Sequence, residues 1–295
     1  APPAPAPPAG PPPPPGAIDE DALRAALAEL DALVGLAAVK EEIRRLVAFA
    51  RVQRRRAAEG HKVPEMSHHL LFLGPPGTGK TTVARLLGRL YRAVGVLGGG
   101  HVVEVDRAGL VAGYVGQTAP RVNAACDRAL DGVLFVDEAY ALVREGAQGD
   151  FGEEALAALI KRMEDDRERL LVVLAGYEEP MQELLDANPG LSSRMPNRIR
   201  FAAYAAGELA EIFRRMSRGD DYRLEPEADA ALTRVCEALA ARADEPDFGN
   251  ARTVRNLYEE ALMRHAERVA DAPGADLSAL TAGDIEQAAA ALPVD

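Results

Sequence analysis

Two hydrophobic patterns divide the chain. Between residues 70 and 201, short uninterrupted apolar runs alternate with longer stretches whose apolar positions recur every three or four residues. An uninterrupted run predicts a strand that is buried on both faces, and the longer periodicity predicts helices. Strands next to helices in this order are typical of an α/β fold, a parallel sheet covered by helices. The predicted strands are residues 70–73, 102–105, 133–136, 171–175 and 199–201.

Helical patterns precede and follow this region. Asp19 is expected to begin a helix over residues 22–30, and a long amphipathic helix should then end at Gly60. Beyond Tyr204 we expect the strands to stop and an all-helical domain to follow. Its predicted helices are residues 208–215, 226–241, 251–270 and 282–291.

The first residues differ from the rest of the chain. Residues 1–16 contain only proline, alanine and glycine, which favours an extended, disordered tail without a core. We therefore divide the chain into a tail (1–17), an α/β domain (18–203) and a helical lid domain (204–295).

Composition narrows the classes of partner and compartment. The 295 residues carry a net charge of −12, which argues against a broad attraction to nucleic acid. The basic cluster at residues 51–56 is either the solvated face of a helix or a local basic groove. Cys126 and Cys236 lie in apolar helical patterns, so we expect buried thiols and a cytoplasmic location. No apolar run reaches the roughly 18 residues of a membrane span.

A phosphate-binding loop follows the first predicted strand. Residues 74–81, "GPPGTGKT", match G-x-x-x-x-G-K-[ST] between a strand and a helix. Glycines let backbone amides approach phosphate oxygens; Lys80 would contact the β- and γ-phosphates, and the Thr81 hydroxyl would bind Mg²⁺. The motif therefore predicts a bound nucleoside triphosphate with Mg²⁺. The expected nucleotide-binding residues are Pro76, Gly77, Thr78, Gly79, Lys80, Thr81 and Thr82.

An acidic pair follows the third predicted strand. Asp137 and Glu138 come directly after the apolar residues 133–136. Asp137 is expected to hold Mg²⁺ through water, and Glu138 to polarise the attacking water as a general base. A second carboxylate at this place favours a hydrolase over a switch or a transferase.

Three further features point beyond nucleotide binding. Tyr114 is flanked by glycines in a predicted loop, where an exposed ring can grip a polypeptide. Arg194 and Arg198 lie just before the last strand, where an arginine can reach the γ-phosphate of a neighbouring subunit. Arg252 and Arg255 share a face at the start of a helix in the lid.

In this order the features resemble the AAA+ ATPases, over residues 31–292. The resemblance implies a ring, usually a hexamer, with nucleotide between the α/β domain and the lid. It also implies roles for individual residues. These are Val34 and Gly35 beside the adenine, Tyr114, Val115 and Gly116 in the central pore loop, Arg194 as arginine finger and Arg252 as the sensor-2 arginine.

Longer stretches resemble the CbxX/CfxQ subfamily, which includes red-type Rubisco activases, a stage V sporulation protein and the C-terminal module of type VII secretion ATPases. They include "GYVGQTAP", "GVLFVDEAYAL", "VVLAGYEEPM" and "NPGLSSR". One position departs from many AAA+ proteins, which carry an asparagine as sensor 1 after the fourth strand. Tyr177 or Glu178 occupies that region here.

Together these features predict a Mg²⁺-dependent ATPase that remodels or threads a partner protein through a ring pore, without inserting into a membrane. Two alternatives stay open. One is a nucleic-acid motor or clamp loader, and the other is a scaffold whose assembly ATP controls.

Overall fold

The computed structural model describes residues 18–64, 66–114, 116–143, 151–243, 245 and 248–292. The chain divides into two compact units. The first contains the chain up to Leu73 together with Lys80–Arg200, and the second contains Gly74–Gly79 together with Phe201–Asp295. The predicted tail at residues 1–17 lies outside the described residues.

A five-stranded parallel sheet forms the centre of the first unit, in the order β2-β3-β4-β1-β5. All five predicted strands are therefore confirmed, with small shifts at their ends. The strands are β1 (Leu70–Leu73), β2 (Val102–Val105), β3 (Gly132–Val136), β4 (Leu170–Gly176) and β5 (Asn197–Arg200).

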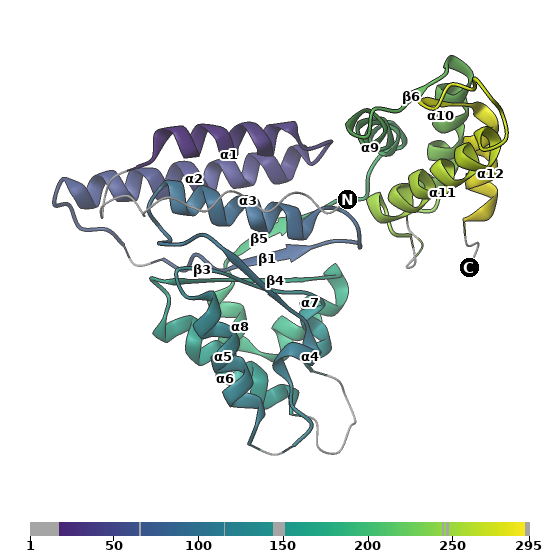
Figure 1. Ribbon diagram of the computed structural model, residues 1–295. Helices are drawn as coiled ribbons and strands as arrows, with labels where there is room; N and C mark the ends of the chain where they lie inside the picture. The colour runs from purple at the N-terminus through teal and green to yellow at the C-terminus, as the bar shows by residue number, and fades with distance from the viewer. Residues whose placement is uncertain are drawn as a thin grey trace. The chain divides into compact units, whose positions relative to one another are not determined.

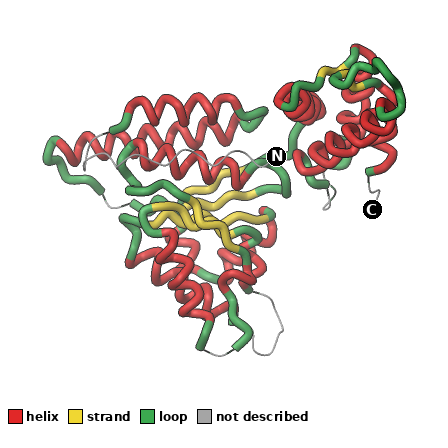
Figure 2. The backbone as a smooth tube through the Cα atoms, in the orientation of Figure 1, coloured by secondary structure: helices red, strands yellow, loops and turns green. Residues whose placement is uncertain are grey.

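Helices cover both faces of this sheet, as Figures 1 and 2 show. One face is covered by α1 (Glu20–Ala32), α2 (Ala37–Ala58) and α3 (Lys80–Ala93). The other is covered by α5 (Thr118–Ala129), α6 (Gly152–Asp165), α7 (Glu178–Ala187) and α8 (Pro189–Arg194). Two short helices, α4 (Arg107–Leu110) and η1 (Ala139–Leu142), follow β2 and β3.

The strands separate two apolar layers because successive side chains point to opposite faces. Leu71 and Leu73 of β1 belong to the core shared with α5 and α6. Leu70 and Phe72 therefore point to the other face, and both are fully buried. This double burial explains why an uninterrupted apolar run, without polar alternation, identified β1 from the sequence.

The first helix begins as its sequence predicts. The Asp19 side chain accepts a hydrogen bond of 2.9 Å from the backbone N–H of Ala22, which caps α1. Its buried residues Leu23, Ala26 and Leu30 recur every three or four positions and form one apolar face, and α1 packs against α3.

The second unit consists mainly of α9 (Ala206–Gly219), α10 (Pro226–Ala240), α11 (Ala251–Val269) and α12 (Ala282–Ala291). At the start of α12, Asp284 is 3% exposed and accepts two hydrogen bonds from Arg268, of 3.0 and 2.8 Å. Asp284 also accepts a hydrogen bond of 2.8 Å from the backbone N–H of Thr281. Asp284 therefore caps α12 and links it to α11.

The expectation that strands stop beyond Tyr204 is wrong in one detail. β6 (Arg223–Leu224) and β7 (Ala279–Leu280) form a parallel two-stranded ladder. Each lies just before a helix, and their backbone groups pair: the N–H of Arg223 donates to the carbonyl of Ser278 at 2.9 Å. Two-residue strands are too short to produce a hydrophobic period, so the sequence pattern does not show them.

Both cysteines are buried and free, as predicted, Cys126 in α5 and Cys236 in α10. Burial raises the pKa of the Cys126 thiol to about 11 and that of Cys236 to about 12.

Within the described residues, no helix combines the length and the apolar character that a membrane span requires.

Candidate active site

The phosphate-binding loop has a backbone that requires glycine. Gly77 and Gly79 have φ angles of +69° and +91°, a backbone conformation that residues with a side chain rarely adopt. A Cβ at Gly77 would lie 1.9 Å from the carbonyl oxygen of Gly249, and one at Gly74 would lie 2.1 Å from that of Phe201. Gly74 and Gly77 are therefore required by close contact with neighbouring backbone, and Gly77 and Gly79 also by their positive φ angles. A chain bend of this kind at successive glycines is typical of phosphate-binding loops.

Residues from the second unit hold this loop in place. The buried Asn250 donates from Nδ2 to the carbonyl of Pro76 at 3.1 Å, and its Oδ1 accepts from the backbone N–H of Tyr204 at 3.0 Å. The N–H of Ala251 donates to the carbonyl of Gly77 at 3.2 Å. Asn250 was missed among the candidate residues, although a polar residue between "DFG" and a predicted helix start is the kind of signal that marks a cap.

The helix α3 begins at Lys80, directly after the loop. Lys80 and Thr81 are partly buried in its first turn, and Thr82 is exposed. The N-terminus of a helix favours anions because its free N–H groups and dipole are positive there. Among the described residues, no group of three His, Cys, Asp or Glu side chains could hold a metal.

The acidic pair follows β3, whose five residues are all buried. The N–H of Asp137 donates to the carbonyl of Val105 at 2.9 Å, and the N–H of Glu138 donates to Oδ1 of Asp137 at 3.1 Å. Glu138 has a left-handed backbone, with φ at 48°, which is costly for a residue with a side chain. Such strain at a residue after a buried strand is common in catalytic turns.

Arg107 fixes the turn that follows the acidic pair. Its Nη1 donates to the carbonyl oxygens of Ala141 and Leu142, at 2.6 and 2.8 Å. Arg107 follows β2, the neighbour of β3 in the sheet. It therefore links two strand ends on the edge that carries Glu138, a role that the sequence alone did not indicate.

The two candidates for sensor 1 have different surroundings. The ring centroid of Tyr177 lies 6.1 Å from the ring centroid of Tyr140. Tyr140 belongs to the acidic turn, because it follows Glu138 by two residues. Burial, and then the negative charge of Glu138, raise the pKa of the Tyr140 hydroxyl. Glu178 instead forms an ion pair of 2.7 Å with Arg200 on β5. Tyr177 therefore contacts the acidic turn, whereas Glu178 contacts β5.

The loop of Tyr114 is exposed, as expected. The Tyr114 side chain is 74% exposed, and Gly116 has a φ of +77° with open space around it. Val115 lies outside the described residues. A hollow of about 450 Å³ is lined both by Gly113, which precedes the tyrosine, and by Glu138.

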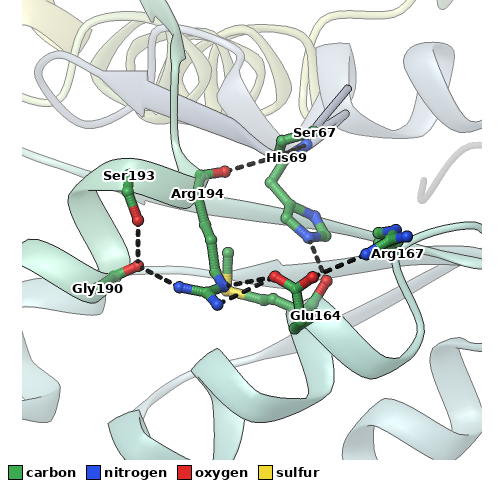
Figure 3. Close-up of polar contacts among 8 residues, drawn as sticks. Ser67, His69, Glu164, Arg167, Gly190, Ser193 and Arg194 are labelled. Atoms are coloured by element: carbon green, nitrogen blue, oxygen red, sulfur yellow. Dashed lines mark hydrogen bonds and ion pairs between the residues drawn. The ribbon is translucent and has the colours of Figure 1, made fainter. Parts of the chain in front are cut away.

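The arginine candidates occupy two regions. Arg194 ends α8 and pairs with Glu164, as Figure 3 shows. Arg198 on β5 donates to Oε1 of Gln182 at 2.9 Å. Arg252 and Arg255 lie in the first two turns of α11, and both are exposed.

The predicted adenine contact lies in the turn between α1 and α2. Gly35 and Leu36 both have left-handed backbones, with φ of 59° and 58°. The Lys40 ammonium fixes this turn by donating to the carbonyl oxygens of Asp31 and Leu33, at 3.1 and 2.6 Å. Val34 and Gly35 are partly buried.

Two family models together match most of the chain after residue 69. Residues 70–203 match the ATPase family associated with various cellular activities (AAA), and residues 205–294 match the AAA lid domain. The fold is also similar to the crystal structure of the FIGL-1 AAA domain in complex with ADP. That similarity has a TM-score of 0.64 at 21% identity and covers 95% of this chain and 93% of that one.

Curated relatives are similar over most of this chain. It is 42% identical to the plasmid-encoded protein CbxX of Cupriavidus necator, covering 88% of this chain and 83% of that protein. It is 41% identical to the stage V sporulation protein K of Bacillus subtilis, covering 82% and 74%. The ESX-3 secretion system protein EccA3 of Mycolicibacterium smegmatis is 42% identical over 94% of this chain, which spans only 48% of that protein.

Proposed function

Because the chain belongs to the AAA family of ATPases, and within it to the CbxX/CfxQ group, we propose that it uses ATP hydrolysis to remodel a partner polypeptide. Residues 70–203 form an ATPase domain that binds nucleotide. The single observation that carries the further step, from hydrolysis to remodelling, is the exposed Tyr114.

We assign the chemistry to residues at the carboxyl edge of the sheet. Lys80 neutralises phosphate charge at the start of α3, and Glu138 accepts a proton from the attacking water. Mg²⁺, bound with help from Thr81 and Asp137, supplies charge stabilisation on the phosphates when present. The strained turn after β3, which Arg107 holds through the backbone, supports this assignment because it fixes the backbone that carries Glu138.

The arginines complete the proposed site. Arg194 acts as a finger on the neighbouring subunit's nucleotide in a ring, which we take to be a hexamer, and Arg252 contacts the phosphates from the lid. Val34 and Gly35 lie beside the adenine. We keep the division into an ATPase domain (18–203) and a lid (204–295) as part of this proposal, since a nucleotide held by both would couple hydrolysis to domain motion.

The proposal connects hydrolysis to the loop of Tyr114. Glu138 and Gly113 line the same hollow, so a change at the acidic turn has a short path to the exposed ring. An exposed aromatic ring packs on a polypeptide without requiring a particular sequence.

The first test replaces Glu138 with Gln. Turnover should fall by roughly 100-fold or more while ATP still binds, because the proton acceptor is lost and the phosphate contacts remain. Glu183→Gln, an exposed glutamate on α7, is the matched control and should hydrolyse ATP at the parent rate. Parent-like turnover in Glu138→Gln would show that the base assignment is wrong.

The second test separates remodelling from hydrolysis. The Glu138→Gln variant, held in ATP, is used to retain partner proteins from a cell extract, alone and combined with Tyr114→Ala or Tyr114→Phe. We expect Ala to abolish retention and Phe to keep most of it, while basal hydrolysis on the parent background is unaffected by either. Equal retention by the variants with Tyr114 and with Ala at this position would contradict a role of the tyrosine side chain in gripping the substrate.

The same preparations distinguish the two alternatives. A nucleic-acid motor would hydrolyse ATP faster with DNA, and that stimulation would fall steeply with salt; the net charge of −12 argues against it. A scaffold would bind one nucleotide per site with negligible turnover.

A further inference from the structure

We propose that Glu164 is a positioning residue that holds the guanidinium of Arg194 in the orientation from which it contacts a neighbouring subunit's phosphate. This inference rests on the proposed function, in which Arg194 acts between subunits. Figure 3 shows the contacts that carry it. Glu164 lies at the end of α6 and Arg194 at the end of α8, thirty residues apart in the chain.

The two side chains meet through one edge of the guanidinium. Nε and Nη2 of Arg194 both approach Oε2 of Glu164, at 3.1 and 3.0 Å. Nη1 donates to the carbonyl of Gly190, one turn earlier in α8, at 3.0 Å. Contacts on two sides of a planar group fix both its place and the direction of its plane.

These contacts leave the guanidinium able to bind an anion. Arginine has five N–H groups, and two of those in Arg194 donate hydrogen bonds, from Nε to Glu164 and from Nη1 to Gly190. Nη2 forms the ion pair with the same carboxylate oxygen of Glu164. Within the described residues, Nη1 and Nη2 therefore each keep at least one N–H that donates no hydrogen bond, and a two-point contact with a phosphate requires two such groups. The Arg194 side chain is 30% exposed, so it is accessible from outside this chain.

The backbones behind both side chains are attached to one short segment before β1. The Ser67 hydroxyl donates to the carbonyl of Arg194 at 2.6 Å. The His69 Nε2 bonds to the carbonyl of Met163, the residue before Glu164, at 3.0 Å. Because the segment of Ser67 and His69 holds α6 and α8 at the same time, the distance between Glu164 and Arg194 is set by the fold.

Arg167 holds the other oxygen of the same carboxylate. Its Nη1 contacts Oε1 of Glu164 at 2.8 Å, so each oxygen faces a different arginine. The hydrogen bond from Arg167, and then the charge of Arg194, lower the pKa of Glu164 below its usual range. Glu164 therefore stays ionised at neutral pH.

The experiment measures steady-state ATP turnover of the assembled full chain. Glu164→Ala should lower kcat roughly 10-fold with little change in KM, because a displaced guanidinium loses transition-state contact without affecting nucleotide binding in its own subunit. Glu164→Asp should recover part of the rate. Glu168→Ala, which removes an exposed glutamate four residues further along the chain, is the matched control, and kcat should stay within about 2-fold.

A double-mutant cycle distinguishes positioning from a structural role. On an Arg194→Ala background, measured with radiolabelled ATP, Glu164→Ala should cause no further loss, because the group that it positions is absent. An equal loss on both backgrounds, or no loss in Glu164→Ala alone, would overturn the inference. If Arg194→Ala itself keeps the parent rate, the finger assignment in the proposed function fails, and that result is visible without any change at Glu164.

Discussion

His69 is a buried residue whose neutral form the fold requires. It lies directly before β1 and is 2% exposed. The backbone N–H of Val172 donates to its Nδ1 at 3.1 Å, so this nitrogen carries no proton. The carbonyl of Met163 can only accept, so Nε2, 3.0 Å away, carries the proton and donates it. Protonation of the imidazole would add a proton to Nδ1, where it would face the N–H of Val172.

The pKa of His69 gives the size of the effect. Burial, opposed by the hydrogen bond to Met163, lowers it from 6.5 to about 4. The unfolded chain then binds more protons than the native one between these values, so stability is fully present above about pH 6.5 and is lost as the pH falls toward 4. The whole difference is about 3 kcal/mol, of which about 2 kcal/mol is lost by pH 5.

The assay compares the parent with His69→Asn, in which an amide oxygen can still accept from Val172 but no group titrates. Hydrogen exchange of peptides from β1 and β4, corrected for the intrinsic effect of pH, reports the free energy of opening in the unit that contains His69. We expect the parent to lose about 2 kcal/mol more than the variant between roughly pH 7.5 and pH 5. The control is His61→Asn, since His61 is exposed and should follow the parent.

Parallel curves for the parent and His69→Asn would refute the reasoning. They would mean that the native fold accepts the charged imidazole, and that the two hydrogen bonds do not fix its tautomer. A steeper loss in the variant would contradict it equally.

Three more predictions concern the loop, the lid and the thiols. Gly77→Ala should weaken ATP binding about 10-fold or more in a nucleotide titration, because Gly77 has a positive φ and an added Cβ would meet the carbonyl of Gly249. Gly219→Ala is the control and should leave binding unchanged, because there is open space around Gly219. Asp284→Ala should raise the free energy of the folded lid by about 2–4 kcal/mol, measured by thermal unfolding. Burial alone would raise the Asp284 pKa, but the hydrogen bonds from Arg268 and Thr281 together lower it, so this contribution fades only below about pH 4. Cys126 and Cys236 should react with a thiol reagent near pH 8 only after denaturant is added, because both are buried with raised pKa values.

The sheet was predictable to the extent that its strands are buried on both faces. β1 has four buried residues and its predicted bounds are confirmed. β5 was placed two residues too late at its start, because only Ile199 of this strand is buried and its neighbours Arg198 and Arg200 are exposed. Arg200 reaches Glu178 instead of the core, and an apolar run does not record such a contact.

The polar contacts that position the site were not predictable. Ser67 bonds to the backbone of Arg194, 127 residues away, and Asn250 to that of Pro76, 174 residues away. Serine and asparagine are ordinary in turns, and nothing in one sequence indicates which distant carbonyl each will meet. Likewise Glu164 belongs to an acidic, polar helix end that resembles any solvated surface.

The sites singled out by motif are held mainly by hydrogen bonds to backbone from residues outside the motifs. Asn250 binds the phosphate loop, Arg107 the turn after the acidic pair, and Ser67 the end of α8. A backbone carbonyl that accepts a hydrogen bond from a buried or partly buried donor is held in position, because moving it away would leave the donor unsatisfied at a cost of about 1–3 kcal/mol. An exposed ion pair contributes less than about 1 kcal/mol and restricts position weakly. Glu164 therefore orients Arg194 effectively only because the backbones of both residues are already fixed through the segment before β1.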